Sequence, residues 1–212
     1  MRLTVVILLV VCTAAICVGA VVSGPRAPDG TEVQCDLPVD LHRRNSVSQG
    51  QGCCVWTSIH HAAVWQNVPA YQEAPAWIQQ HRIPGGAYPR AVERYLPQMA
   101  RERGYDTTPA FLNYEGNDLE LLRLACRTGR MPAVTYTFSP SGRYGGQRIA
   151  HMVNLVHADD RWFAVLDNNY VGENQLEWMT PEEFRKTWTG FGTGWAVILL
   201  TPPPPPPPRN IE

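Results

Sequence analysis

The stretch that decides the fold is residues 49–59, which read Gln-Gly-Gln-Gly-Cys-Cys-Val-Trp-Thr-Ser-Ile. A polar, glycine-containing loop ends at Cys53 and Cys54, and the apolar residues that follow predict a buried helix from Val55 to about Trp65. A thiol in the first turn of a helix lies beside backbone N–H groups without an intrahelical partner, at the positive end of the helix dipole. That setting favours the thiolate, the nucleophilic form of cysteine. We therefore expect a reactive cysteine here.

A base and its orienting group are expected far downstream, at His151 and Asp167. His151 lies near the start of one predicted strand, and Asp167 ends the next. If the turn between these strands has three residues, the two side chains stand opposite each other on one face of the sheet. The carboxylate then accepts a hydrogen bond from one imidazole nitrogen while the other faces the sulfur. A turn with an even number of residues places Asn168 opposite His151 instead, so Asn168 is the alternative orienter.

These residues, in this order, resemble the papain-like cysteine peptidase superfamily. In that family a Gln precedes a Cys at a helix start, as Gln49 does here, and a Ser follows four residues after the Cys, as Ser58 follows Cys54. The double-glycine (bacteriocin-leader-processing) branch is the most similar, because a Gly and a nearby Pro, followed by a strand, precede the His strand, as in residues 129–134, which read Gly-Arg-Met-Pro-Ala-Val. The resemblance covers about residues 45–200.

The resemblance implies a role for each of these residues. Cys54 is expected to be the nucleophile, His151 the base, Asp167 the orienter and Gln49 a donor to the oxyanion. The expected reaction is hydrolysis of peptide bonds in a peptide or protein substrate, through a thioester and without a cofactor. Gln49 lies one residue closer to the cysteine than the family pattern has it, so Gln51 is the alternative donor; Cys53 is the alternative nucleophile.

Two other functions fit a similar set of residues. A transglutaminase-like acyltransferase has a Cys–His–Asp triad in nearly the same order and spacing, and differs in using an amine to resolve the thioester. A catalytically inactive papain-like domain used for binding is the third hypothesis. The presence of all four expected catalytic side chains argues against it, because binding alone does not require them.

The order of predicted elements favours an α+β fold of the papain-like type. Helices are expected at residues 55–65, 70–82, 89–103 and 117–127, and strands follow at 133–138, 149–157, 162–167 and 194–201, with one short helix opening at Thr180. Helices in the first half and strands in the second predict N-terminal helices, the nucleophile helix central among them, packed on a mainly antiparallel C-terminal sheet.

Four segments are expected along the chain. Residues 1–22 are predicted to be a signal peptide or an uncleaved signal anchor, because an apolar run follows Arg2 and small residues precede a cleavage site. Residues 23–44 are interpreted as a linker, 45–201 as the peptidase domain and 202–212 as a polyproline tail. The protein is then secreted or membrane-anchored and extracytoplasmic, with the membrane as a partner if the leader is retained.

Export also makes a disulfide plausible among the cysteines beyond the leader. Cys35 with Cys126, or Cys53 with either of them, leaves Cys54 as a thiol. Adjacent cysteines rarely pair, because the ring is strained.

Composition and spacing argue against other classes of function. The net charge of −1 gives no basic patch for nucleic acid. No His-x-x-x-His or Cys-x-x-Cys spacing predicts a metal site, and adjacent His60 and His61 point to different sides of a helix. His157 shares a strand face with His151 and is the one rival base. Trp188 or Trp195 is expected to shield the catalytic pair from water.

Overall fold

The structure, a computed structural model, describes residues 22–45, 47–48, 51–170 and 176–201. The predicted leader up to residue 21, Gln49 and the polyproline tail therefore lie outside the described residues. Within the described part, no helix combines the length and the apolar character needed to cross a bilayer. The elements are, in order, β1 (Val22–Ser23), β2 (Val47–Ser48), β3 (Gln51–Gly52), α1 (Cys54–Trp65), α2 (Ala74–Gln80), α3 (Pro89–Glu102), β4 (Phe111–Gly116), α4 (Leu119–Arg127), β5 (Ala133–Tyr136), β6 (His151–Ala158), β7 (Phe163–Leu166), β8 (Leu176–Met179), α5 (Pro181–Trp188) and β9 (Gly194–Leu199).

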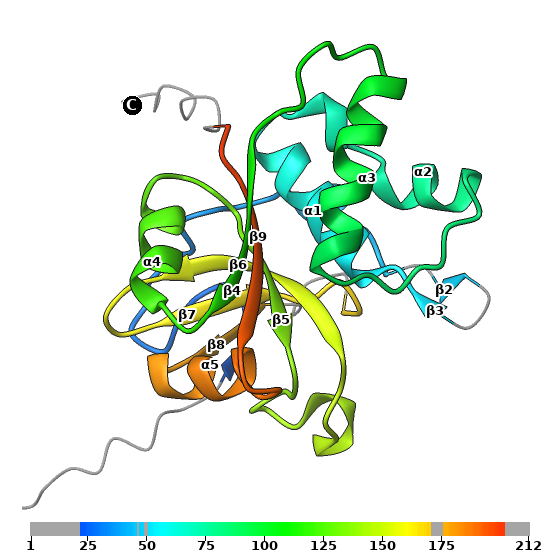
Figure 1. Cartoon of the computed structure of the whole chain (residues 1–212). Coiled ribbons are helices and arrows are strands. Elements are labelled where there is room, and N and C mark those ends of the chain that lie inside the picture. Colours follow the sequence, from blue (N-terminus) through cyan, green and yellow to red (C-terminus); the bar gives the residue numbers. More distant parts are fainter. Residues whose placement is uncertain (1–21, 46, 49–50, 171–175, 202–212) are drawn as a thin grey trace, which may run out of the picture.

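A seven-stranded antiparallel sheet forms the centre of the molecule, in the order β1-β8-β7-β6-β5-β9-β4 (Figure 1). The central strand, β6, is buried along its whole length because helices cover both faces of the sheet. Met152 and Val156 pack into the core with α1–α3, whereas Val153 and Leu155 pack into the core with α4 and α5. The alternation follows from the two-residue period of a strand. The predicted α+β class is confirmed.

The helix ends follow from local sequence signals. Pro89 stands at the start of α3, and Gly104, two residues after its end, has a φ of +81°, a left-handed conformation that glycine adopts without strain. The side chain of Asp118 accepts hydrogen bonds from two N–H groups in the first turn of α4. Thr180, where a short helix was predicted to open, forms a capping box with Glu183 at the start of α5. The same signals are present in the sequence, so these three helices were predictable.

Several elements differ from the sequence predictions. The helix expected at 70–82 is shorter: Glu73, with a φ of +59°, interrupts it, and α2 begins only at Ala74. A residue in the left-handed region cannot continue a right-handed helix. Strands β4 and β8 were not predicted, nor were the two-residue strands β1, β2 and β3. β4 is an edge strand of half-buried and exposed residues, and β8 carries the charged Glu177, so neither has the apolar alternation that marks a strand.

Residues 23–44, expected to be a linker, are instead packed on the sheet. Ser23 pairs with β8, and Ala27, Cys35 and Leu37 are buried. The backbone N–H groups of Gln34 and Cys35 both donate to the carbonyl of Val156, at 3.0 and 2.9 Å. The folded domain therefore begins well before residue 45. Residues 23–44 contain few apolar side chains, which are widely spaced, and the segment has no helix or strand period that would reveal this packing.

Candidate active site

Cys54 is the first residue of α1, and its half-buried sulfur lies between the helix and β6. The sulfur hydrogen-bonds with the His151 side chain and with the backbone of Met152 and Val55. Burial alone raises the pKa of this thiol, but the hydrogen bond and the charge of His151, with the two backbone groups, outweigh it and lower the pKa below its ordinary value. The thiolate form of Cys54 is thus favoured at the start of α1, where the sequence predicts a reactive cysteine.

His151 and Asp167 are in direct contact, as the sequence predicts. Nε2 of His151 lies 2.9 Å from Oδ1 of Asp167, and both side chains are buried. Because Nε2 is engaged by the carboxylate, Nδ1 is the ring nitrogen that remains for Cys54. Burial lowers the pKa of His151, but the hydrogen bonds with Asp167 and Cys54 more than compensate and raise it to about 9. For Asp167, burial acts in the opposite direction and raises the pKa, but the contact with His151 outweighs burial and lowers the pKa of this carboxyl overall.

The strand register behind this contact is not the predicted one. Ala158 pairs with Phe163, so the connection holds residues 159–162, and a bulge follows between Leu155 and His157. Asn154 then pairs with Leu166, and continuing this register does not place Asp167 opposite His151. Continued by one residue, the register places Asp167 opposite Val153, which makes Asp167 a diagonal neighbour of His151 on the same face of the sheet, close enough for their side chains to meet. The bulge also leaves the Val156 carbonyl to accept from the N-terminal segment.

The side chain of Asn168, the alternative orienter, makes its hydrogen bonds with α1 and β6 and not with the His151 ring. Its Nδ2 donates to Oγ of Ser58 at 2.9 Å, to the carbonyl of Met152 at 3.0 Å and to the carbonyl of Cys54 at 3.3 Å. Ser58 in turn donates to the Met152 carbonyl at 3.1 Å. Asn168 therefore ties the first turn of α1 to β6 and holds the nucleophile and base elements together, whereas Asp167 contacts the imidazole.

Two further residues of the site were not found from the sequence. Tyr144 donates its hydroxyl hydrogen to Oδ2 of Asp167 at 2.7 Å, and its ring packs edge-on against His151. Asn169 donates through its backbone N–H to Oδ1 of Asp167 at 3.0 Å, and its Nδ2 donates to the Tyr144 hydroxyl at 3.1 Å. Tyr144 has a φ of +61° in a loop with no periodic pattern. Only the proximity of Asn169 to Asp167 in the sequence was a usable signal.

The remaining predicted residues are placed only in part. The side chains of Gln49 and Gln51 lie outside what the structure describes, although the Gln51 backbone belongs to β3. Cys53, the alternative nucleophile, is fully buried and is the N-cap residue of α1. Cys35, Cys53 and Cys126 carry thiols, so none of the disulfides considered from the sequence is present. Burial raises the pKa of Cys35 to about 12 and that of Cys126 well above its usual value.

The other histidines are engaged in structural hydrogen bonds. Nδ1 of His60 accepts from the backbone N–H of Glu73, and Nε2 of His61 accepts from that of Arg43. Burial lowers the pKa of His60 to about 4 and that of His61 to about 3. His157, the rival base, bonds to Asp159 at the opposite end of β6 from Cys54. Among the described residues, no three His, Cys, Asp or Glu side chains are grouped as metal ligands.

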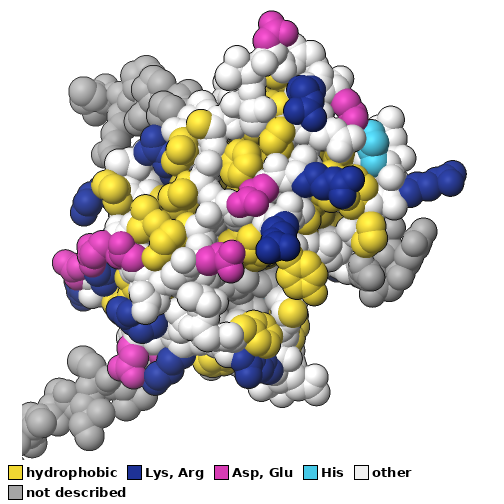
Figure 2. Space-filling model, viewed as in Figure 1, with side chains coloured by type: hydrophobic (Ala, Val, Ile, Leu, Met, Phe, Trp, Pro, Cys, Tyr) yellow, Lys and Arg dark blue, Asp and Glu magenta, His cyan; other side chains and the backbone are white. Residues whose placement is uncertain are grey.

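A cleft of about 950 Å³ opens over Cys54 and His151. One wall comes from the helical half of the chain, including Gly52, Val55 and Tyr88, and the other comes from the sheet half, including Trp195 and Phe191. Of the two tryptophans considered as shields, Trp195 lines the cleft, while Trp188, the last residue of α5, is buried in the core. On the face shown in Figure 2, basic and acidic side chains are interspersed with hydrophobic ones.

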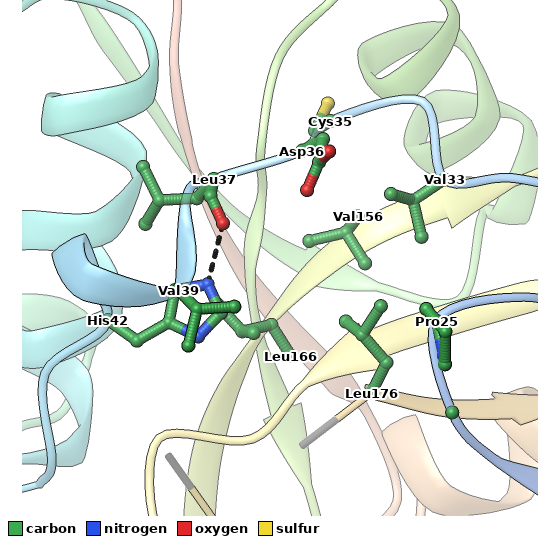
Figure 3. A pocket seen from close by; sticks show the side chains of 11 residues that line it. Pro25, Val33, Cys35, Asp36, Leu37, Val39, His42, Val156, Leu166 and Leu176 are labelled. Carbon is green, nitrogen blue, oxygen red and sulfur yellow. Dashed lines mark hydrogen bonds between the residues drawn. The ribbon is translucent and has the colours of Figure 1, made fainter. Parts of the chain in front are cut away.

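A second cavity, of about 330 Å³, lies between the N-terminal segment and β6–β8 (Figure 3). Its wall is mainly apolar and includes Leu37, Val39, Leu166 and Leu176. Nε2 of His42 lies 2.7 Å from the Leu37 carbonyl at its edge. Neither Cys54 nor His151 lines this cavity, so the chemistry described above belongs to the cleft.

No protein-family model matches the chain, and comparison with curated proteins finds no similar sequence.

Proposed function

We propose that this protein is a cysteine peptidase with a papain-like fold, which hydrolyses peptide bonds through Cys54, His151 and Asp167. The observation that carries the proposal is the continuous hydrogen-bonded chain from the sulfur to the imidazole to the carboxylate, at the floor of a large cleft. The opposed pKa directions of Cys54 and His151 favour a thiolate–imidazolium pair, the form in which such an enzyme attacks.

The proposed reaction follows from this pair. The thiolate attacks the carbonyl carbon, and the Cys54 N–H at the start of α1, with the Gln49 amide, stabilises the oxyanion. The C–N bond breaks as His151 gives its proton to the leaving amine, which leaves an acyl thioester on Cys54. Water then loses a proton to His151 and attacks the thioester, releasing the acid and restoring the thiolate–imidazolium pair. Asp167 holds the ring in position and favours its protonated form.

A transglutaminase-like acyltransferase is the second candidate, because the same triad resolves a thioester with an amine. The proposed location is outside the cytoplasm, secreted or held to a membrane by residues 1–22, where a peptide or protein substrate is met.

The test uses the full chain and two matched variants. Iodoacetamide is expected to alkylate Cys54 rapidly near neutral pH, and a mixture of peptides is expected to be cleaved. Cys54→Ala should abolish both, whereas Cys53→Ala should keep most of each. Cleavage that survives Cys54→Ala, or is lost only in Cys53→Ala, would overturn the assignment. Mass spectrometry with an added primary amine separates the two reactions, because amide products in place of acids indicate acyl transfer.

A further inference from the structure

Apart from the Cys54–His151 pair itself, the cleft over Cys54 has no acidic or basic side chain in its wall among the residues that the structure describes. Its other lining side chains are apolar, aromatic or neutral polar, with Thr135, Ile149 and Met152 on the sheet side. A charged side chain that enters such a wall loses hydration and finds no opposite charge in return. The described wall therefore disfavours charged groups next to the sulfur.

Aromatic side chains stand on both sides of this cleft. Tyr88, from the segment before α3, is 79% exposed, and Phe191, from the segment before β9, is 58% exposed. Large exposed aromatic side chains facing a common hollow mark a binding site, because a ligand that covers them removes apolar surface from water. Trp195, only 8% exposed and fixed by its N–H to Oδ1 of Asn113, forms a firm wall of the same cleft.

Charge begins only outside this aromatic rim. The guanidinium of Arg148 lies 4.2 Å from the centre of the Phe191 ring and packs against it. Beyond Tyr88 a separate hollow of about 590 Å³ is lined by Arg90 and Glu115, which carry opposite charges. The rim thus separates an interior whose charged groups are only the paired Cys54 and His151, among the described lining residues, from an exterior with charges of both signs.

We propose that the cleft selects a peptide segment with a large apolar or aromatic side chain beside the reacting carbonyl, and that Tyr88 and Phe191 determine this specificity. The inference rests on the proposed function of Cys54 and names its substrate class. The side chain packs between the two rings and against Trp195, which brings the adjacent carbonyl to the sulfur. Lys and Glu side chains are rejected because Cys54 and His151 already neutralise each other and the rest of the lining gives a charged group no partner.

Protection of Cys54 from iodoacetamide tests the inference without requiring turnover. The probes are N-acetyl-X-glycinamide peptides in which X is Phe, Leu, Lys or Glu. The Phe and Leu peptides should halve the alkylation rate at concentrations at least about tenfold lower than the Lys and Glu peptides. Tyr88→Ala and Phe191→Ala should each reduce this preference, and Phe191→Glu should shift it toward the Lys peptide. Leu124→Ala, an equally drastic truncation of a 48% exposed side chain on α4, is the matched control and should leave it unchanged.

The outcomes separate the two proposals. Equal protection by all four peptides, or a preference unchanged in both alanine variants, overturns the specificity assignment and leaves the role of Cys54 intact. Slow alkylation of the unprotected wild-type chain contradicts the proposed function, and the peptide preference is still measured at that slower rate. Each variant's alkylation rate with peptide is divided by its own rate without peptide, so the preference is measured independently of any change in the reactivity of Cys54.

Discussion

The carboxylate of Asp167 lies between a strand residue and a loop residue: Oδ1 is 2.9 Å from Nε2 of His151 in β6, and Oδ2 accepts a 2.7 Å hydrogen bond from Tyr144 in the loop before that strand. Each oxygen thus has its own donor. The guanidinium of Arg143 lies 3.8 Å from Oδ2 as well. An anion this deeply buried is stable only when so surrounded, and it in turn fixes the imidazole beside Cys54.

Replacing Asp167 separates the effect of its charge from the effect of its position. Asp167→Asn keeps an oxygen able to accept from Nε2 but removes the charge, so the pKa of His151 should fall from about 9. The imidazolium is then lost at lower pH, and the alkaline limb of the kcat/KM profile moves down in pH. Asp167→Ala removes the contact and should lower kcat/KM by about a hundredfold or more. An alkaline limb unmoved in Asp167→Asn would contradict this account.

Tyr144→Phe tests whether the second donor to Asp167 contributes to the site. The ring against His151 is retained, and only the hydroxyl is lost. A hydrogen bond to a charged group is worth about 1.5–3 kcal/mol, so kcat/KM should fall by about tenfold or more. Tyr170→Phe is the matched control, because Tyr170 packs edge-on against Tyr144 through its ring. Equal losses in the two variants would indicate a general effect of tyrosine substitution.

His61 should make the fold sensitive to acid. Its pKa is lowered by burial from 6.5 to about 3, so the unfolded chain binds the proton more readily than the folded one between these values. Stability from this group is therefore complete above pH 6.5 and is lost as the pH falls toward 3, by up to about 1.4 kcal/mol per pH unit. Chemical denaturation at a series of pH values measures the free energy of unfolding. This free energy should fall less steeply with decreasing pH in His61→Gln than in the wild-type protein. An equally steep fall in both proteins would contradict the prediction.

Gly194→Ala should destabilise the sheet beside the cleft. A Cβ at Gly194 would lie 2.2 Å from Cε2 of Trp188, which is fully buried and cannot move aside. Such overpacking costs about 1–3 kcal/mol, measurable as a lower Tm. Gly52→Ala is the comparison, because there the Cβ meets only the side chain of Asn45, at 2.7 Å. A Tm loss as large in Gly52→Ala would show that the rigid indole is not the cause.

The sequence by itself determined the parts of this protein that depend on local signals. Cys54 at a helix start, Pro89 and Gly104 around α3, and the capping box at Thr180 each act within a few residues, so their structure could be predicted. The contact between His151 and Asp167 was also expected, although for an incorrect register.

Tertiary structure alone decided the rest, because it depends on which distant segments meet. The bulge near Val156, the packing of residues 23–44 and the approach of Tyr144 to Asp167 have no local pattern. A half-exposed edge strand such as β4 gains its hydrogen bonds only from β9, and a loop residue such as Tyr144 gains its partner only when β6 and β7 are paired. The residue types of the candidate site could be predicted from the sequence. The groups that hydrogen-bond to them, such as Tyr144, could be identified only once the sheet was assembled.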